Sequence, residues 1–330
     1  LVIIALYDVG GWSAIKSSLS PEMTHAWKYM YTAKENPMGV NFMSLIFGLG
    51  FVMSFGYFCT DFLVVQRAMI AKNINAAQRT PIIAAIPKML MPLIVVLPGI
   101  IAITLMKASF ASKGFQLPTT STGEIDYTMT LPTMLSHYYK TGILGVGITA
   151  LLASFMSGMA GNVTAFNSVF TYDIYQSYFG KNKSDTHYLQ VGKLVTVLGV
   201  IFSIATAYIA KSFNNINDFL QLVFSFVNGP LFATFLLGMF WKRTTSDGAF
   251  WGLLAGTIFA ALTHGCTIAE GKGGWIYSLY EIKSGMGQAF IVASISWIGN
   301  FVTTIIVSLF TKPKEEILLK GLVYSLTTIT

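Results

Sequence analysis

Charged residues are scarce in this sequence. Asp, Glu, Lys and Arg make up 11% of the 330 residues, whereas a soluble domain usually contains about 25%. Hydrophobic residues make up 54%, and the mean hydropathy is +0.62. This composition excludes a soluble enzyme, a coiled coil, a disordered chain and a collagen. Repeated apolar runs of about 20 residues instead indicate a single bundle of membrane-spanning helices.

Cysteines and catalytic motifs are equally scarce. The two cysteines, Cys59 and Cys266, lie inside apolar runs, so we interpret them as small buried side chains and not as a disulfide framework or a metal site. The sequence contains no GxxxxGK[ST], HExxH or GxSxG motif, and its four histidines have no ligand spacing to an acid or a cysteine. We therefore expect no enzyme, no ATP-driven pump and no cofactor other than a coupling ion.

Positive charge is spread along the chain. No block of basic residues of the kind that tracks phosphates occurs, so the net charge of +7 does not indicate a nucleic-acid partner. Basic residues are densest in short connections, which predicts a cytoplasmic side made of 66–79, 176–187, 241–248 and the tail from 312. The external side would then hold 9–40, 107–141, 211–217 and 269–284, with some helix inside 107–141.

Seven apolar segments are long enough to cross a bilayer. They cover about 41–65, 80–106, 142–175, 188–210, 218–240, 249–268 and 285–311. The apolar stretch before Asp8 is too short to span, so we interpret residues 1–7 as the end of a helix whose start is missing. The expectation is one multi-pass transmembrane domain over residues 1–330, incomplete at its N-terminus and located in the cell membrane.

Lys88 is the clearest polar residue inside an apolar segment. A charge near the bilayer centre costs about 3 kcal/mol on insertion scales, and Lys88 lies eight residues into the 80–106 segment. We interpret it as a residue of a substrate or ion path, and the alternative is a lysine paired with an acid on a neighbouring helix. Four prolines surround it and predict a kinked helix with freed carbonyls, namely Pro81, Pro87, Pro92 and Pro98.

Three other segments carry small or polar residues. In 142–175, one stripe of a helix contains Ala150, Ser154, Ser157, Gly158, Gly161, Ala165 and Ser168. Such a stripe favours close helix packing, while its hydroxyls could supply part of a sodium shell, because hard cations prefer oxygen ligands. In 41–65, three glycines predict either break points or close packing. In 218–240, a polar face must look toward partner helices or a cavity, and it consists of Gln221, Ser225 and Asn228.

Three stretches are similar to one known family. Residues 56–73, GYFCTDFLVVQRAMIAKN, resemble the signature of the sodium:solute symporter family, in which an aromatic stretch leads into Gln-Arg and then Ala-Lys-Asn. Residues 166–175, FNSVFTYDIY, look like the family's eighth core helix, and 240–249, FWKRTTSDGA, resemble the junction after its tenth. Their order and separations also fit, and the resemblance is closest to the branch of sodium/sugar cotransporters.

The resemblance implies an all-α, polytopic membrane bundle with the five-plus-five inverted-repeat (LeuT-type) transporter fold. The chain would cover the second repeat and peripheral helices. It also implies part of a sodium site, with Ser154 contributing its carbonyl, Ser157 its hydroxyl, and Gly158 lying where the sugar transporters usually have a hydroxyl residue. The other half of that site belongs to the family's first core helix.

The resemblance also implies substrate-binding residues. Lys88 falls on the sugar-binding lysine of a bacterial galactose-transporting member, and Tyr57 falls on the inner aromatic gate. Ser54 replaces an asparagine that binds sugar, and Gln221 lies beside Leu222, with which the family's helix-ten glutamine aligns. A lysine with amide and hydroxyl groups suits a neutral polyol.

The expected function is therefore a secondary symporter, not an enzyme. It would couple inward movement of Na⁺ to import of a sugar or similar polyhydroxylated solute by alternating access, with the lipid bilayer as its surroundings and no nucleic-acid partner. The alternatives are a transporter-like membrane sensor of a small solute and a sodium symporter for inositol, an amino acid or a carboxylate.

Overall fold

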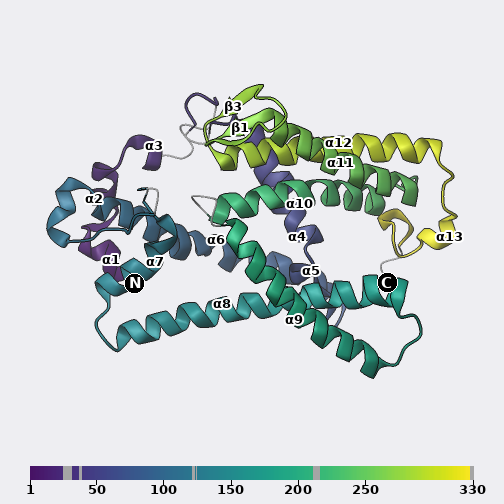
Figure 1. Ribbon diagram of the computed structural model, residues 1–330, viewed down its shortest axis with the longest axis horizontal. Coiled ribbons are helices and arrows are strands. Elements are labelled where there is room, and N and C mark those ends of the chain that lie inside the picture. The colour runs from purple at the N-terminus through teal and green to yellow at the C-terminus, as the bar shows by residue number, and fades with distance from the viewer. Residues whose placement is uncertain (25–31, 37–38, 121–122, 124, 211–215, 328–330) are drawn as a thin grey trace. The chain divides into compact units, whose positions relative to one another are not determined.

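The computed structural model divides the chain into two compact units. Unit 1 contains Leu1–Thr24 and Gln66–Ile216, and unit 2 contains His25–Val65 and Asn217–Thr330. The structure describes residues 1–24, 32–36, 39–120, 123, 125–210 and 216–327. Figure 1 shows that helices dominate both units. That the chain forms a single transmembrane domain stays a prediction.

Unit 1 is built from helices of very different lengths. Its short helices are α1 (Val2–Asp8), α2 (Gly11–Ser18), α3 (Pro21–Thr24), α7 (Thr130–Tyr138) and the 3-10 turns η2 (Ala108–Lys113) and η3 (Tyr127–Met129). Its long helices are α6 (Ile74–Leu105), α8 (Ile143–Ser168) and α9 (Asp185–Ala210), and α8 continues as a π-helix, η4 (Val169–Phe179). The helical content of 107–141 agrees with the expectation for that connection.

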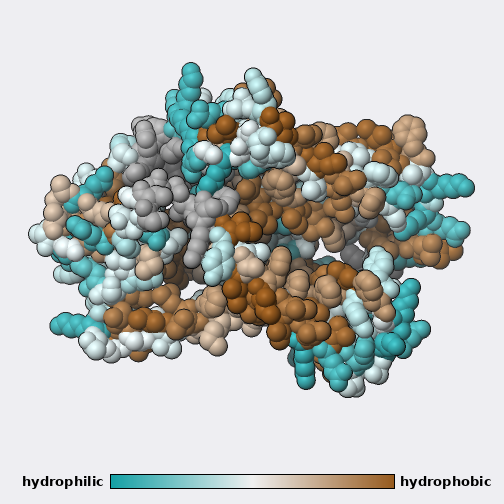
Figure 2. Space-filling model, in the orientation of Figure 1, coloured by the Kyte–Doolittle hydropathy of each residue, from teal (hydrophilic) through white to brown (hydrophobic). Residues whose placement is uncertain are grey.

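The core of unit 1 lies at one end of α6. Ile101 and Leu105 of this helix are buried with Ala5, Ile15 and Met134, which come from α1, α2 and α7. Residues 78–96 of α6 are exposed, and α8 has no buried residue among those described. Figure 2 shows hydrophobic residues lying on the surface along α8. Helices that are apolar all round suit a bilayer and not water.

Unit 2 combines a bent helix with three long ones. The bent helix runs through the π-helix η1 (Ser44–Phe55) and α4 (Gly56–Thr60) into α5 (Phe62–Met69). The others are α10 (Ile216–Phe240), α11 (Ser246–Cys266) and α12 (Gly285–Phe310), followed by α13 (Glu316–Leu319) and the 3-10 turn η5 (Tyr324–Leu326). Three short strands lie between α11 and α12, namely β1 (Thr267–Ala269), β2 (Lys272–Gly273) and β3 (Tyr280–Ile282).

The strands form a small sheet in the order β2-β1-β3. β1 pairs antiparallel with β2, with Ala269 opposite Lys272, and parallel with β3, with Ala269 opposite Ile282. The turn between β1 and β2 uses left-handed backbone at Glu270 and Gly271, with φ of 50° and 74°. Apart from this sheet the named elements are helical.

Glycines let α11 and α12 approach closely. Gly248, Gly252 and Gly256 recur every four residues on α11 and are buried. A Cβ at Gly256 would lie 2.8 Å from Cβ of Pro230 and 2.9 Å from Cβ of Asn300. Asn300 in turn donates a hydrogen bond to the Pro230 carbonyl at 2.8 Å. Small residues and polar side chains of this kind hold membrane helices together.

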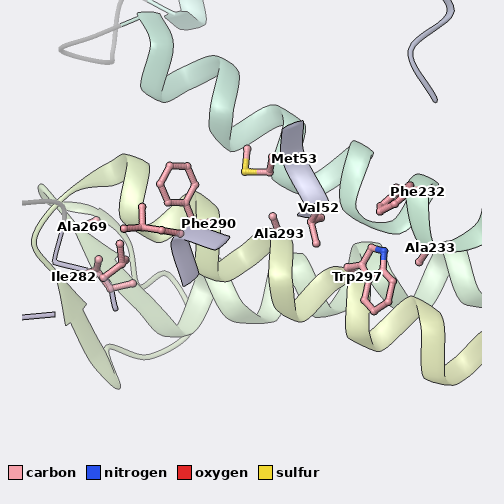
Figure 3. Close-up of a cluster of buried hydrophobic side chains, with 11 residues drawn as sticks. Val52, Met53, Phe232, Ala233, Ala269, Ile282, Phe290, Ala293 and Trp297 are labelled. Carbon is pink, nitrogen blue, oxygen red and sulfur yellow. The ribbon is translucent and has the colours of Figure 1, made fainter. Parts of the chain in front are cut away.

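The bent helix packs on the same bundle through apolar side chains. Val52 and Met53 of η1 are buried with Phe290 and Trp297 of α12 and with Phe232 of α10 (Figure 3). The ring centroids of Phe51 and Phe232 are 5.1 Å apart. This cluster fixes the position of Ser54 and Tyr57, which follow directly along the chain.

Six helices of the described part are long and apolar enough to span a membrane, and the bent pair is a seventh candidate. Each of the seven predicted segments overlaps one of them. The 80–106 segment belongs to a helix that already begins at Ile74, because the Asn73 side chain accepts a hydrogen bond from the Ala76 amide at 2.8 Å and caps the start of α6.

Two of the three glycines of 41–65, Gly48 and Gly56, are packing residues, whereas Gly50 is exposed. A Cβ at Gly48 would lie 2.5 Å from the Phe290 carbonyl oxygen, and one at Gly56 would lie 2.8 Å from Cγ of Phe232. The 47° bend instead falls between α4 and α5 at Asp61, whose backbone is extended, with φ −73° and ψ 121°. Aspartate favours helix ends over helix interiors, because its side chain competes for backbone hydrogen bonds.

Candidate functional site

Lys88 lies near the middle of α6. It is 14 residues after Ile74, or about 21 Å along a helix about 48 Å long at 1.5 Å per residue. Lys88 lies further from the start of its helix than the 80–106 boundary suggested, because α6 begins six residues earlier. The residues on both sides of it, from 81 to 96, are exposed.

The prolines act on the backbone at Lys88. All four lie inside α6, which remains one helix over its 32 residues. Proline has no N–H, and Pro92 is four residues after Lys88, so the helix does not supply the usual donor to the Lys88 carbonyl. The helix therefore lacks its regular i to i+4 hydrogen bond at the residue that carries the ammonium group.

Ser154, Ser157 and Gly158 are exposed on α8. Ser154 and Ser157 are three residues apart and share a face. Other hydroxyls of this helix bond back to the chain: Thr149 donates to the Gly145 carbonyl and Thr164 to the Ala160 carbonyl, both at 2.8 Å.

The two serines differ from those threonines. Within the described residues, neither the Ser154 nor the Ser157 hydroxyl makes such a bond. Asn162 Nδ2 donates to the Gly158 carbonyl at 3.0 Å, and a Cβ placed on Gly158 meets no described atom within 4 Å. The predicted sodium residues therefore offer two hydroxyls and an open position on one face of α8.

Ser54 and Tyr57 lie in unit 2, where η1 passes into α4. Ser54 is exposed, whereas Tyr57 is half-buried. The ring centroid of Tyr57 is 5.7 Å from that of Phe224 on α10. Gln221 is also half-buried and precedes Phe224 by three residues, about one turn of α10. The structure thus brings Tyr57 to the same part of α10 as Gln221.

The rest of the polar face of α10 is used for helix packing. Ser225 and Asn228 are buried, and Ser296 of α12 donates a hydrogen bond to the Ser225 carbonyl at 3.1 Å. The face therefore looks inward, as predicted, and its partner is α12. Nδ2 of Asn228 is a buried donor without a hydrogen-bond partner among the described residues.

Asp61 is a residue to which the sequence analysis assigned no role. Its Oδ1 atom is buried and lacks a hydrogen-bond partner in the described part of the chain. An unpaired carboxylate oxygen in a membrane span is costly, and it lies here at the 47° bend. In the sequence, Asp61 could have been recognised as an acidic residue inside the apolar segment 41–65. The interpretation of that segment concerned its three glycines instead.

Cys59 corrects one expectation about the cysteines. Both thiols are free, but Cys59 is exposed and Cys266 is intermediate in exposure, so neither is a fully buried side chain. Cys59 lies on α4, a short helix of which Gly56 is the buried residue. No group of three or more His, Cys, Asp and Glu side chains in the described ranges could hold a metal ion.

An ion pair joins α1 to the connection between α6 and α7 in unit 1. Lys113 forms a salt bridge with Asp8, and the Tyr138 hydroxyl donates to Oδ2 of Asp8 at 3.0 Å. The hydrogen bond from Lys113 holds the pKa of Asp8 below its ordinary value of 3.8. Burial, with the neighbouring Asp8 carboxylate, raises the pKa of Tyr138. These interactions link α1, η2 and α7, which are short elements of unit 1.

The model of the sodium:solute symporter family matches residues 1–256. The chain belongs to this family. Its similarity to curated members extends further along the sequence. It is 27% identical to sodium/glucose cotransporter 1 of Oryctolagus cuniculus over 98% of this chain and 52% of that protein. It is 30% identical to the sodium/glucose cotransporter of Vibrio parahaemolyticus over 70% of this chain and 43% of that protein.

A sodium/myo-inositol cotransporter of Homo sapiens is also similar, at 26% identity over 96% of this chain and 48% of that protein. The chain thus spans about half the length of the curated relatives it matches. Family members are transporters and not enzymes. The predicted family and its sodium/glucose branch are confirmed.

A solved structure shares the fold. The structure of a Na⁺-coupled sialic acid symporter in a substrate-bound outward-open state matches with a TM-score of 0.64 and 20% identity, over 95% of this chain and 60% of that one. This similarity, with the long apolar helices, confirms the predicted class of an all-α, polytopic, inverted-repeat transporter fold. The chain is a multi-pass membrane protein.

Proposed function

We propose that the protein of which this chain is part is a sodium-coupled symporter that imports a sugar or a similar polyhydroxylated solute. Family membership supports coupled transport as the general activity. The observation that carries the sodium part is the Ser157 hydroxyl on α8, which does not bond back to its own helix among the described residues. In this proposal alternating access links occupancy of the sodium site to substrate movement.

The sodium site uses neutral oxygens from α8. Ser157 contributes its hydroxyl and Ser154 its carbonyl. Gly158 follows Ser157 directly on the same face of α8. A hydroxyl that is bonded within its helix must break that bond to bind an ion, whereas an unbonded one does not. The exposed face of α8 gives these groups access to an ion, and the ligands from elsewhere in the protein complete the shell.

The proposed substrate-binding residues are Lys88, Tyr57, Gln221 and Ser54, which together offer hydrogen-bond donors and acceptors. Lys88 donates from its ammonium group, and Tyr57 offers an aromatic face beside the turn of α10 that carries Gln221. Ser54 adds a hydroxyl at the end of η1. Sugars present several hydroxyls without net charge, so a cationic donor with neutral amide and hydroxyl groups matches them without a counter-charge.

The sodium part is tested by removing one hydroxyl at a time. Ser157→Ala should raise the Na⁺ concentration needed for half-maximal substrate binding, because it removes an ion ligand. Thr164→Val is the matched control, since it also removes a hydroxyl from α8 but one that bonds to Ala160. Equal Na⁺ dependence of Ser157→Ala and the unsubstituted protein, measured by scintillation proximity binding, would contradict the proposed site.

A second candidate is sodium symport of another solute. The human relative is a sodium/myo-inositol cotransporter, and the similar solved structure is of a sialic acid symporter. A polyol ring and a carboxylate are both compatible with Lys88, which can donate to neutral or anionic oxygens. Binding of glucose, galactose, myo-inositol, sialic acid and an amino acid, each measured with and without Na⁺, separates these substrates.

A further inference from the structure

A short segment follows α12 along the chain. Residues 312–326, here called the C-terminal segment, follow α12 and include α13 and η5. Within unit 2, α13 and the β1–β3 sheet lie at opposite ends of α12 (Figure 1). The segment therefore occupies the end of the bundle that the density of basic residues predicts to be cytoplasmic.

Contacts fix the C-terminal segment against the ends of the long helices. Leu319 and Val323 are buried, at 8% and 2% exposure. The ring centroid of Tyr324 is 5.8 Å from that of Phe240, the last residue of α10. Lys242, two residues further, has its Nζ 3.5 Å from Oε1 of Glu316. The segment thus lies at the level where α10 ends and does not extend away from it.

The C-terminal segment also carries exposed aliphatic side chains. Ile317 is 74% exposed, Leu318 63% and Leu322 68%. Three large aliphatic side chains displayed together would be unfavourable in water, at about 25 cal/mol for each Å² of apolar surface. They lie next to the end of a membrane-spanning helix, where an apolar phase is within reach.

Cationic side chains accompany the aliphatic ones. Lys312, Lys314 and Lys320 are exposed, and the two acids of the segment are Glu315 and Glu316, of which Glu316 pairs with Lys242. Figure 2 shows hydrophilic and hydrophobic residues side by side at this end of the molecule. Lysines beside inserted aliphatic side chains are the pattern that binds the headgroup layer of an anionic membrane.

The opposite end of α12 has the features of the other membrane interface. Trp275, Tyr277 and Tyr280, in and before β3, are exposed. Aromatic residues of this type gather at the level of lipid headgroups. The 26 residues of α12 that separate the two ends span about 39 Å, close to the roughly 40–45 Å of a bilayer with its headgroups.

We propose that the C-terminal segment is an interfacial anchor that lies on the cytoplasmic leaflet. Ile317, Leu318 and Leu322 insert at the boundary of the hydrocarbon layer, and the three lysines bind the phosphates of anionic phospholipids. The buried Leu319 and Val323 transmit this attachment to the end of the α10–α12 bundle. The proposal rests on membrane insertion of the bundle and is independent of the substrate.

Spin labels test the depth of the segment in the whole protein. Leu318→Cys or Glu315→Cys is labelled in a Cys59→Ser, Cys266→Ser background and reconstituted in nanodiscs of phosphatidylcholine, with or without phosphatidylglycerol. Oxygen concentrates in the bilayer and a nickel chelate stays in water. We expect the label at 318 to be relaxed by oxygen and shielded from nickel, and the label at 315 to show the reverse.

The lysines are tested in the same system. Phosphatidylglycerol should increase the shielding of the label at 318, and replacing Lys312, Lys314 and Lys320 by Gln should abolish that increase, since each lysine contributes about fivefold to binding of an anionic surface. The control replaces Lys107, Lys272 and Lys283 by Gln, on the predicted external side, and should retain the increase.

Three outcomes would overturn the proposal. Nickel that reaches position 318 as readily as position 315 would mean that the segment lies in water. Shielding of 318 from both reagents means that protein, and not lipid, covers Leu318. An undiminished response to phosphatidylglycerol in the variant lacking the three lysines means that these residues do not bind the anionic headgroups.

Discussion

Lys88 combines two features at one residue of α6. Its ammonium group lies about 21 Å along the helix, and the proline four residues later removes the helical donor to its carbonyl. In the proposed substrate site, the ammonium group donates to hydroxyl oxygens of a polyol.

Lys88→Ala should weaken substrate binding by about 10- to 100-fold, because a hydrogen bond from a charged group contributes roughly 1.5–3 kcal/mol. Binding of the substrate is measured by isothermal titration calorimetry on purified protein. Lys107→Ala, at an exposed lysine just after α6, should leave affinity unchanged. Retained affinity in a monodisperse Lys88→Ala protein would mean that the lysine has a structural role.

Gly158 provides a test in which a group is added. A serine there would supply the hydroxyl that sugar transporters of this family usually have, and its Cβ meets no described atom within 4 Å. Gly158→Ser should lower the half-maximal Na⁺ concentration several-fold, since one added oxygen ligand is worth about 1 kcal/mol. Gly145→Ser, at an equally open position on α8, should have no effect on Na⁺ dependence.

From the lowered pKa of Asp8 we expect the free energy of unfolding to depend on pH. Because its pKa is lowered in the folded state by Lys113, it contributes stability above the ordinary carboxyl pKa of 3.8, and this contribution is lost as the pH falls through the lower folded value. Asp8→Asn should reduce the free energy of unfolding by roughly 0.5–1 kcal/mol at neutral pH, as expected for a partly exposed pair.

The measurement for Asp8 is thermal unfolding in detergent between pH 7 and pH 3. The difference between Asp8→Asn and the unsubstituted protein should shrink toward the acid end of this range. Glu315→Gln, at an exposed carboxylate, is the control and should show no difference at either end. A constant difference across the range would show that the ion pair with Lys113 is not its source.

The elements differ in what holds them in place. Glycines of α11 let it approach α12, and the hydrogen bonds of Asn300 join α12 to α10, whereas α8 has no buried residue among those described. Changes within the α10–α12 bundle should therefore act on stability, and changes on the exposed face of α8 should act on ligands.

Gly256→Ala tests the packing of the bundle. The added Cβ would lie 2.8 Å from Cβ of Pro230 and 2.9 Å from Cβ of Asn300, and neither atom can rotate away, so we expect a loss of about 1–3 kcal/mol. Gly238→Ala on α10, where a Cβ meets no described atom within 4 Å, should be neutral or slightly stabilising. Equal melting temperatures for the two variants would contradict the packing account.

The long helices could be predicted from the sequence because their apolar runs are long and the bilayer requires helices. The start of α6 could not be located, since residues 74–79 are mostly polar or small and only the Asn73 cap defines it. The sequence left open whether the glycines of 41–65 break a helix or pack closely, because composition does not tell whether a glycine such as Gly48 packs against Phe290.

The candidate site could be predicted in part. The spacing of Ser154 and Ser157 placed them on one face of a helix, and they lie there in the structure. Within the described part of the chain their hydroxyls make no hydrogen bond, while those of Thr149 and Thr164 bond back to the helix. This difference depends on side-chain rotamers, which the spacing of residues does not predict. The burial of Ser225 and Asn228 against α12 likewise depends on which helix packs beside them.

At the scale of the whole molecule, the chain is a multi-pass membrane protein of the sodium:solute symporter family with the inverted-repeat fold. The proposed sodium and substrate residues belong to α6, α8, α10 and the η1–α4 helix. The proposed anchor lies at the end of unit 2, away from all of them in the sequence. Transport and lipid attachment can thus be altered by separate substitutions.

Solute accumulation in proteoliposomes tests the central proposal most directly. The whole protein is reconstituted, an inward Na⁺ gradient is imposed, and uptake of the solute selected by the binding panel is followed with a radiolabel. We predict accumulation above the external concentration, which disappears when K⁺ replaces Na⁺ or when the gradient is dissipated. Uptake that is the same in Na⁺ and in K⁺ would contradict sodium coupling.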